Sequence, residues 1–161
     1  MRGYRITRTE SRSGRLIGIL DGTGASIFGA RWNSPGRSVI YAAEHFSLAM
    51  LEVVVHANAP MPPMQYAEIS IPEDVQIEEA RIEDLPPGWD SIPYQRASQE
   101  YGDKWYDKGG TAVLLVPSVV AKIERNVLIN PRHPDFSRLI RAADPRPVIW
   151  DPRLFPVFNK E

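Results

Sequence analysis

The sequence predicts a single α+β domain over residues 1–161. Segments with the pattern of strands and segments with the composition of helices both occur. They do not alternate regularly, as a doubly wound parallel sheet would require. The length suits one domain with its own core. Hydrophobic residues make up 43% of the chain and charged residues 24%, so global disorder is not indicated.

Six segments have the pattern of β-strands: residues 4–8, 38–41, 65–72, 75–80, 111–117 and 127–131. The most informative of them is TAVLLVP at residues 111–117. A continuous apolar run of this length is typical of a strand that is buried on both faces. We therefore predict that it is the central strand of the sheet.

Two segments have the composition of helices. Residues 44–56, EHFSLAMLEVVVH, hold no glycine or proline, begin with good helix formers and stop before the run ANAPMPP. A second helix is predicted within residues 91–106, centred on residues 95–101, before the turn at Lys108-Gly109-Gly110.

The other segments are expected to be irregular. Residues 11–29 are rich in Gly, Ser and Thr and predict a loop with one brief strand at residues 16–20. Frequent prolines after His133 indicate an irregular tail. Six apolar side chains are expected to anchor this tail to the domain: Ile140, Val148, Ile149, Trp150, Leu154 and Phe155.

Composition excludes several classes of function. The net charge is −1 and no basic stripe occurs, so nucleic acid is not the expected partner. No cysteine is present, which removes disulfides, thiolate metal sites and a cysteine nucleophile. The three histidines lack metal-ligand spacing, and no metal is expected. Because the start is polar and basic and no apolar run could span a bilayer, we expect a cytoplasmic protein without a membrane anchor.

Familiar catalytic motifs are also missing. Gly22 and Gly24 are followed by Ile27 where the dinucleotide fingerprint needs a third glycine. No Walker A sequence occurs. Ser118 lies in VPSVV and not in GxSxG, so a nucleophile elbow is unsupported.

Glu52 is the most informative single residue. On the predicted helix its neighbours are mainly apolar, among them Leu48, Ala49 and Val55. A carboxylate in such a setting needs a cleft, a partner or a raised pKa. The helix alone is as compatible with a structural reading as with a functional role; in the structural reading Glu52 pairs with a nearby arginine or lies at a partly exposed edge of the helix.

Arg31 and Tyr41 lie in the stretch before this helix. Arg31 follows Gly24 and Gly29, which permit the backbone to approach a ligand closely. Its guanidinium can form two parallel hydrogen bonds to a phosphate. Tyr41 ends a predicted strand, where side chains often face a pocket. Taken alone, Arg31 also reads as a solvated loop residue and Tyr41 as a core tyrosine with a satisfied hydroxyl.

Together these residues resemble the RES domain, the toxin half of the bacterial RES–Xre type II toxin–antitoxin systems. The family is named for an arginine, a glutamate and a serine, which fall here on Arg31, Glu52 and Ser118. The resemblance includes YRI at the start, GxRWNxPGxxVxYxxE, LAMLEVVVH, YGDKW, VPSVVxxxExNxLINPxHPDF and DPRLF. It covers nearly the whole chain.

The resemblance implies a fold and an activity. The fold would be similar to the ADP-ribosyltransferases, with a mixed, mainly antiparallel split β-sheet flanked by helices. The activity would break the nicotinamide–ribose bond of NAD and pass ADP-ribose to water, phosphate or a protein. NAD would be the substrate, with no further cofactor, and an Xre-type antitoxin would block the pocket.

Three residues would then form the catalytic centre. Positive charge collects on the ribose as nicotinamide leaves, and Glu52 would stabilise it. Arg31 would bind the pyrophosphate, which its planar fork fits. Tyr41 would stack on nicotinamide or bond the ribose.

Four further residues are expected around this centre. Trp32 and Asn33 would line the same pocket, and Tyr4 is a weaker candidate for the nicotinamide side. Ser118 is expected to orient Glu52 or Arg31 by a hydrogen bond and not to act as a nucleophile.

Three matters stay open at this point. A second acid that activates the acceptor is not placed, and Glu44 and Glu68 are candidates. One alternative is a non-catalytic nucleotide-binding module in which Arg31 and Glu52 form a structural pair. Another is a sugar or nucleoside hydrolase unrelated to NAD.

Overall fold

The computed structural model describes residues 1–57 and 61–155. Within them one sheet runs in the order β4-β5-β6-β2-β1-β3-β7, with β8 also paired to β3. The strands are β1 (Arg2–Arg8), β2 (Ile40–Ala43), β3 (Met64–Ser70), β4 (Ile77–Glu79), β5 (Val113–Pro117), β6 (Arg125–Ile129), β7 (Arg141–Ala142) and β8 (Arg146–Pro147). The helices are α1 (Thr23–Phe28), α2 (Phe46–Val54), α3 (Arg96–Lys108) and α4 (Pro134–Leu139), with short 3-10 turns at Ile82–Asp84 and Pro152–Leu154. The α+β prediction is confirmed.

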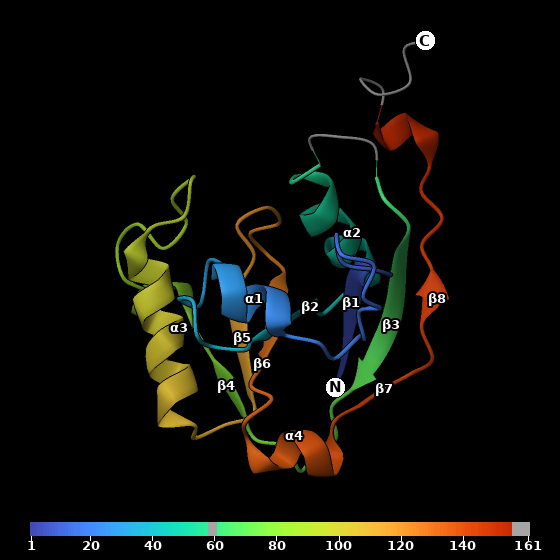
Figure 1. Cartoon of the computed structure of the whole chain (residues 1–161). Helices are drawn as coiled ribbons and strands as arrows, with labels where there is room; N and C mark the ends of the chain where they lie inside the picture. Colours follow the sequence, from blue (N-terminus) through green and yellow to red (C-terminus); the bar gives the residue numbers. More distant parts are fainter. Residues whose placement is uncertain (58–60, 156–161) are drawn as a thin grey trace.

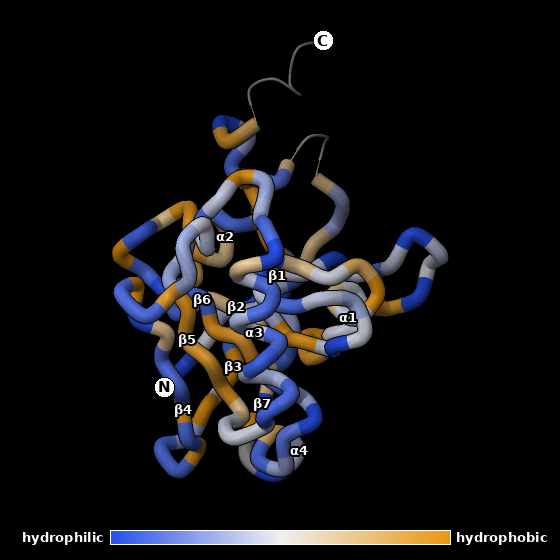
Figure 2. The backbone as a smooth tube through the Cα atoms, turned by 90° about the vertical axis from the view of Figure 1, so that its left-hand side faces the viewer, coloured by the Kyte–Doolittle hydropathy of each residue, from blue (hydrophilic) through white to orange (hydrophobic). Residues whose placement is uncertain are grey.

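The sheet is mixed but mainly antiparallel. The β4–β5 pair is parallel, and the other pairs that the structure describes are antiparallel. In Figure 1, α3 lies beside the β4–β5–β6 part of the sheet, and α2 lies close to β1 and β2. In Figure 2 the trace near β5 is coloured as strongly hydrophobic.

Strand β5 is an interior strand buried on both faces, as its apolar run predicts, but it lies second from the edge of the sheet and not at its centre. It pairs with β4 on one side and β6 on the other. Its side chains divide between two cores: Leu114 and Val116 pack with Trp32 and Trp105, whereas Val113 and Leu115 pack in the core on the other face. A strand buried on both faces cannot alternate with polar residues, which explains the sequence pattern.

Helix α2 is shorter than the predicted range of residues 44–56. It begins at Phe46, and Val55 closes the last turn through its backbone N–H to Leu51 O. Leu48 and Ala49 pack with Ala43 of β2, with Tyr4 and Ile6 of β1 beside them. This packing fixes one side of α2 against the sheet.

The region expected to be a loop contains a helix. Residues 23–28 form α1, which begins where Asp21 Oδ1 accepts a hydrogen bond from Thr23 N at 2.7 Å. No residue of α1 is buried, so the sequence carries no apolar periodicity that would reveal it. The brief strand expected at residues 16–20 is wrong, because Leu16 makes a single bridge to Glu10 and is 75% exposed.

The segment after His133 contains helix α4, and fewer of its apolar side chains are buried than expected. Pro134 opens α4, and His133 caps it by accepting a hydrogen bond from Asp135 N. Ile140 is buried, as predicted. The same prediction is wrong for Ile149 and Leu154, which are 88% and 44% exposed. No helix within residues 1–57 and 61–155 has the length and hydrophobicity needed to cross a bilayer.

Candidate active site around Glu52

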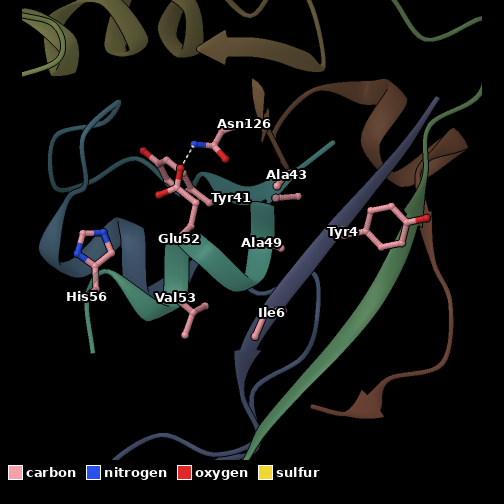
Figure 3. Close-up of a pocket in the computed structure, with 10 residues that line it drawn as sticks. Tyr4, Ile6, Tyr41, Ala43, Ala49, Glu52, Val53, His56 and Asn126 are labelled. Atoms are coloured by element: carbon pink, nitrogen blue, oxygen red, sulfur yellow. Dashed lines mark hydrogen bonds between the residues drawn. The ribbon is translucent and has the colours of Figure 1, made fainter. Parts of the chain in front are cut away.

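The side of α2 that faces the sheet carries Glu52. Ala49 precedes Glu52 and Val53 by three and four residues, and His56 follows them by four and three, so all four lie on one side of the helix and its final turn. All four line a small cavity between α2 and strands β1 and β2 (Figure 3). The sequence thus places one carboxylate and one imidazole on a surface that is otherwise apolar.

The carboxylate of Glu52 is held by two hydrogen bonds to the same oxygen. Ser118 Oγ donates to Oε1 at 2.8 Å, and Asn126 Nδ2 donates to Oε1 at 2.7 Å. Figure 3 shows Asn126 reaching Glu52 from the sheet. The other oxygen, Oε2, has no hydrogen bond among the described residues and is not enclosed by protein. Oε2 is therefore the carboxylate oxygen that a ligand can contact.

Ser118 is fully buried directly after β5. Besides donating to Glu52, its Oγ accepts hydrogen bonds from Val120 N at 3.1 Å and Ala121 N at 3.0 Å. The hydroxyl is thus fully engaged in fixing the β5–β6 turn and Glu52. This is the contact that we expected of Ser118, and it leaves no nucleophilic oxygen.

Asn126 is the residue that our reading of the sequence missed. It lies opposite Ala43 in the β2–β6 ladder, which puts its side chain on the same face as Tyr41 and Ala43. Two signals were available: Asn126 is the asparagine of ExNxLINP in the RES resemblance, and it is a polar residue in the strand RNVLI, whose last three residues are buried. Neither signal reveals what Asn126 faces until the strand register is known.

Two cavities meet at Glu52. The smaller has a volume of about 190 Å³ and the larger about 780 Å³. Four residues line both, and thus stand at the junction: Tyr41, Glu52, His56 and Asn126. The small chamber is otherwise almost entirely apolar, with Ile6, Ala49 and Val53 among its walls. The large chamber falls within the ordinary size of a small-molecule site.

Arg31 lines the large chamber. Its Nη1 donates to Trp89 O at 2.9 Å and to Ser91 O at 3.0 Å, and the guanidinium lies 5.9 Å from the Tyr94 ring centre. Burial lowers the pKa of Arg31, an effect that the nearby Glu52 carboxylate partly offsets, and the group stays a cation at neutral pH. Its Nε and Nη2 make no hydrogen bond within the described residues and are not enclosed. They are free to bind an anion.

The structural Arg31–Glu52 pair considered above is not formed. The ion pairs of the described residues include none between these two side chains. Arg31 uses backbone carbonyls and Glu52 uses neutral donors. Each charge is thus placed separately, and both remain available to a ligand.

The loop that carries Arg31 is fixed by hydrogen bonds from several directions. Tyr41 Oη donates to Asn33 Oδ1 at 2.7 Å and accepts from Trp32 N at 3.2 Å. Gln99 Nε2 of α3 donates to Ala30 O at 3.1 Å and to Asn33 O at 3.2 Å. Burial raises the pKa of Tyr41, so its hydroxyl stays protonated. Tyr41 lines both cavities, but its hydroxyl is bonded to the loop at Trp32 and Asn33.

Helix α3 approaches this loop closely at Gly102. A Cβ built on Gly102 would lie 1.9 Å from Trp32 O, a distance that no side chain tolerates. Glycine is therefore required for α3 to lie against the loop. Tight packing and the Gln99 hydrogen bonds together set the position of Arg31.

The other predicted site residues divide into two groups. Trp32 lines the large chamber and stacks on Trp89 at 6.0 Å, and Tyr4 lines the small chamber. Asn33 does not line either chamber. It is fully buried behind the wall, where Nδ2 donates to Ala25 O, Ser34 O and Arg37 O, so the expectation that it lines the pocket is corrected.

Neither candidate for a second acid lies in the chambers. Glu44 is held by Arg125 through two hydrogen bonds of 2.7 Å. Glu68 accepts from Tyr4 Oη at 3.3 Å and pairs with Arg2. Both carboxylates are already paired and do not line either cavity.

Known proteins resemble this chain over most of its length. The model of the RES domain matches residues 2–151. A protein named Prs ADP-ribosylating toxin from Sphingobium sp. is 44% identical over 139 residues, which are 84% of this chain and 86% of that protein. A protein named Toxin Res from Yersinia enterocolitica is 36% identical and covers 86% of this chain and 92% of its own length.

The fold also has a solved counterpart. A chain in the crystal structure of the M. tuberculosis MbcT–MbcA toxin–antitoxin complex superposes with a TM-score of 0.72 at 18% identity, covering 91% of this chain and 83% of that one. This likeness supports the α+β architecture described above. The family match and the sequence relatives lead to one conclusion: the chain belongs to the RES-domain toxin family.

Proposed function

We propose that this protein is the toxin of a toxin–antitoxin system and that it breaks the nicotinamide–ribose bond of NAD. The observation that carries the proposal is the carboxylate of Glu52, held through Oε1 with Oε2 open at the junction of two chambers. A fixed carboxylate in a largely apolar setting stabilises positive charge well, because it needs no reorganisation when that charge develops.

The two chambers suit the two halves of NAD. The small apolar chamber of about 190 Å³ suits the flat nicotinamide ring, which leaves as a neutral molecule. The larger chamber of about 780 Å³ suits ADP-ribose, with the free Nε and Nη2 of Arg31 binding the pyrophosphate. This arrangement would bring the bond to be broken beside Glu52.

In the proposed reaction the bond between C1′ and the nicotinamide nitrogen breaks, and its electron pair goes to that nitrogen. The ribose becomes oxocarbenium-like, and Oε2 of Glu52 faces the positive charge. Ser118 and Asn126 hold Glu52 so that Oε2 keeps this position. The acceptor bonds to C1′ as nicotinamide leaves.

We infer a protein acceptor and an antitoxin partner from the relatives. The relative with 44% identity is named as ADP-ribosylating, which favours transfer to a protein over release to water or phosphate. The structural counterpart was solved with its antitoxin. For this chain we propose an antitoxin, of the Xre type that the family resemblance implies, which covers the mouth of the large chamber.

Mass spectrometry of the products tests the reaction. Purified protein, freed of any antitoxin, is incubated with NAD in buffer, in phosphate and in cell lysate. Free ADP-ribose, ADP-ribose phosphate and a protein carrying ADP-ribose differ in mass, so one experiment identifies the acceptor. We expect a modified protein in lysate, and the absence of all three products would reject the proposed function.

A further inference from the structure

The proposed reaction needs a base besides Glu52, and this inference rests on that proposal. A water, hydroxyl or amine acceptor must lose a proton as it bonds to C1′, and a positioned side chain speeds that step by about 100-fold or more. The charge-stabilising carboxylate cannot also take up this proton without losing the charge for which it is placed. A second proton acceptor should therefore lie at the junction of the chambers.

Few groups in the chambers can accept a proton. The titratable and charged side chains that line them are Tyr4, Arg31, Tyr41, Glu52, His56 and Tyr94. Arg31 is a cation with no acceptor atom. Burial raises the pKa of Tyr41, and its hydroxyl is already bonded to Trp32 and Asn33. Tyr4 Oη is bonded to Glu68, and imidazole is the side chain that serves most often as a general base, so His56 is the candidate.

His56 stands where that base is needed. It follows Glu52 by four residues, one helical turn, and it lines both chambers. Figure 3 shows the imidazole and the Glu52 carboxylate at the same end of α2.

The other two histidines are engaged elsewhere. His45 Nδ1 lies 3.4 Å from Glu124 Oε2, and His133 Nδ1 accepts a hydrogen bond from Asp135 N. Within residues 1–57 and 61–155 the imidazole of His56 has no hydrogen bond or ion pair. An exposed imidazole without a partner among the described residues, at the meeting point of both chambers, is available to a ligand or an acceptor.

We propose that His56 is the base that takes the proton from the acceptor. The acceptor's O–H or N–H bond breaks, the proton moves to a ring nitrogen of His56, and the freed electron pair forms the bond to C1′. As that bond forms, nicotinamide leaves with the electron pair of its own bond to C1′, so the release of nicotinamide depends on the base. His56 then returns the proton to solvent, so the enzyme is unchanged after each turnover.

Azide rescue of the His56→Gln variant tests this role. Azide is an anion that attacks C1′ without losing a proton, so it does not need the base. Nicotinamide release is followed in phosphate-free buffer and in lysate, with and without azide. His45→Gln is the matched control, because it removes a histidine that lines neither chamber, and melting temperatures show whether the variants fold.

We expect His56→Gln to release nicotinamide about 100-fold more slowly than wild type, and azide to restore release with ADP-ribosyl azide as the product. Wild-type rates in His56→Gln would overturn the proposal, and so would a loss that azide does not restore, because that points to binding or structure. Turnover of wild type with phosphate alone would overturn it as well. If wild type releases no nicotinamide with any acceptor or with azide, the proposed function itself has failed, an outcome distinct from an active wild type with an unaffected variant.

Discussion

Ser118 Oγ and Asn126 Nδ2 both donate to Oε1 of Glu52, at 2.8 and 2.7 Å. Ser118 follows β5, and Asn126 lies in β6, so two adjacent interior strands determine where a carboxylate on α2 points. One oxygen is fixed and the other is left for substrate. The predictions that follow depend on this arrangement or on the loop that carries Arg31.

Asn126→Ala should lower kcat and leave KM for NAD almost unchanged. A hydrogen bond to a charged group contributes about 1.5–3 kcal/mol, which corresponds to roughly 10- to 100-fold if the bond matters mainly in the transition state. Steady-state kinetics of nicotinamide release measure this. Asn126→Asp should lose more than Asn126→Ala, because it puts a second negative charge beside Glu52. A rise in KM with kcat intact would contradict the positioning role.

Arg31→Ala should lower kcat/KM for NAD but not for nicotinamide riboside, which has no pyrophosphate. The expected loss for NAD is about 10- to 100-fold, from the charged hydrogen bonds to phosphate oxygens. Arg31→Lys should recover part of it, because the charge returns without the planar fork. Equal losses with both substrates would mean that Arg31 acts through the Trp89–Ser91 loop, to which its Nη1 is bonded, and not on the pyrophosphate.

Gly102→Ala should destabilise the protein even though alanine favours a helix by about 1 kcal/mol over glycine. The new Cβ would lie 1.9 Å from Trp32 O, so α3 and the Arg31 loop must move apart. Gly24→Ala is the control, because Gly24 lies in α1 with nothing within 4 Å of its Cβ position. Thermal melting should show a fall for Gly102→Ala and no fall for Gly24→Ala. Equal effects would contradict the close approach.

Tyr41→Phe should cost about 1–3 kcal/mol at neutral pH, because Trp32 N and Asn33 Oδ1 lose their partner. Burial raises the pKa of Tyr41 above its value of about 10 in the unfolded chain. Above pH 10 the unfolded chain therefore loses the Tyr41 proton first, and the stability that Tyr41 contributes falls by about 1.4 kcal/mol per pH unit. Urea unfolding of both proteins from pH 8 to 11 measures this. A constant difference between them across that range would contradict the burial of the hydroxyl.

The sequence predicts those features whose signal lies in the segment itself. The apolar run of β5 and the helix-forming composition of α2 are of this kind, and both elements form. Helix α1 escapes prediction because it has six residues and none of its side chains is buried, so its sequence has no apolar periodicity.

The site residues divide in the same way, into those with a signal in their own segment and those without one. Glu52 stands out because a carboxylate among apolar neighbours needs a reason, and Ser118 enters through the family resemblance. Asn126 depends on the register between β2 and β6, and the partners of Arg31 are carbonyls of a loop some 60 residues away. No local pattern encodes such pairings, which is why a structural Arg31–Glu52 pair was a reasonable but wrong alternative.

The central claim is that Glu52 stabilises the charge formed when NAD loses nicotinamide. The most direct measurement is nicotinamide release from NAD by wild type and by Glu52→Gln, each free of antitoxin and supplied with water, phosphate or lysate as acceptor, with Glu83→Gln as an exposed control. We predict release by wild type and by the control, and a rate roughly 100- to 1,000-fold lower for Glu52→Gln at an unchanged melting temperature. A wild-type rate in Glu52→Gln, or no release by wild type with any acceptor, would contradict the account.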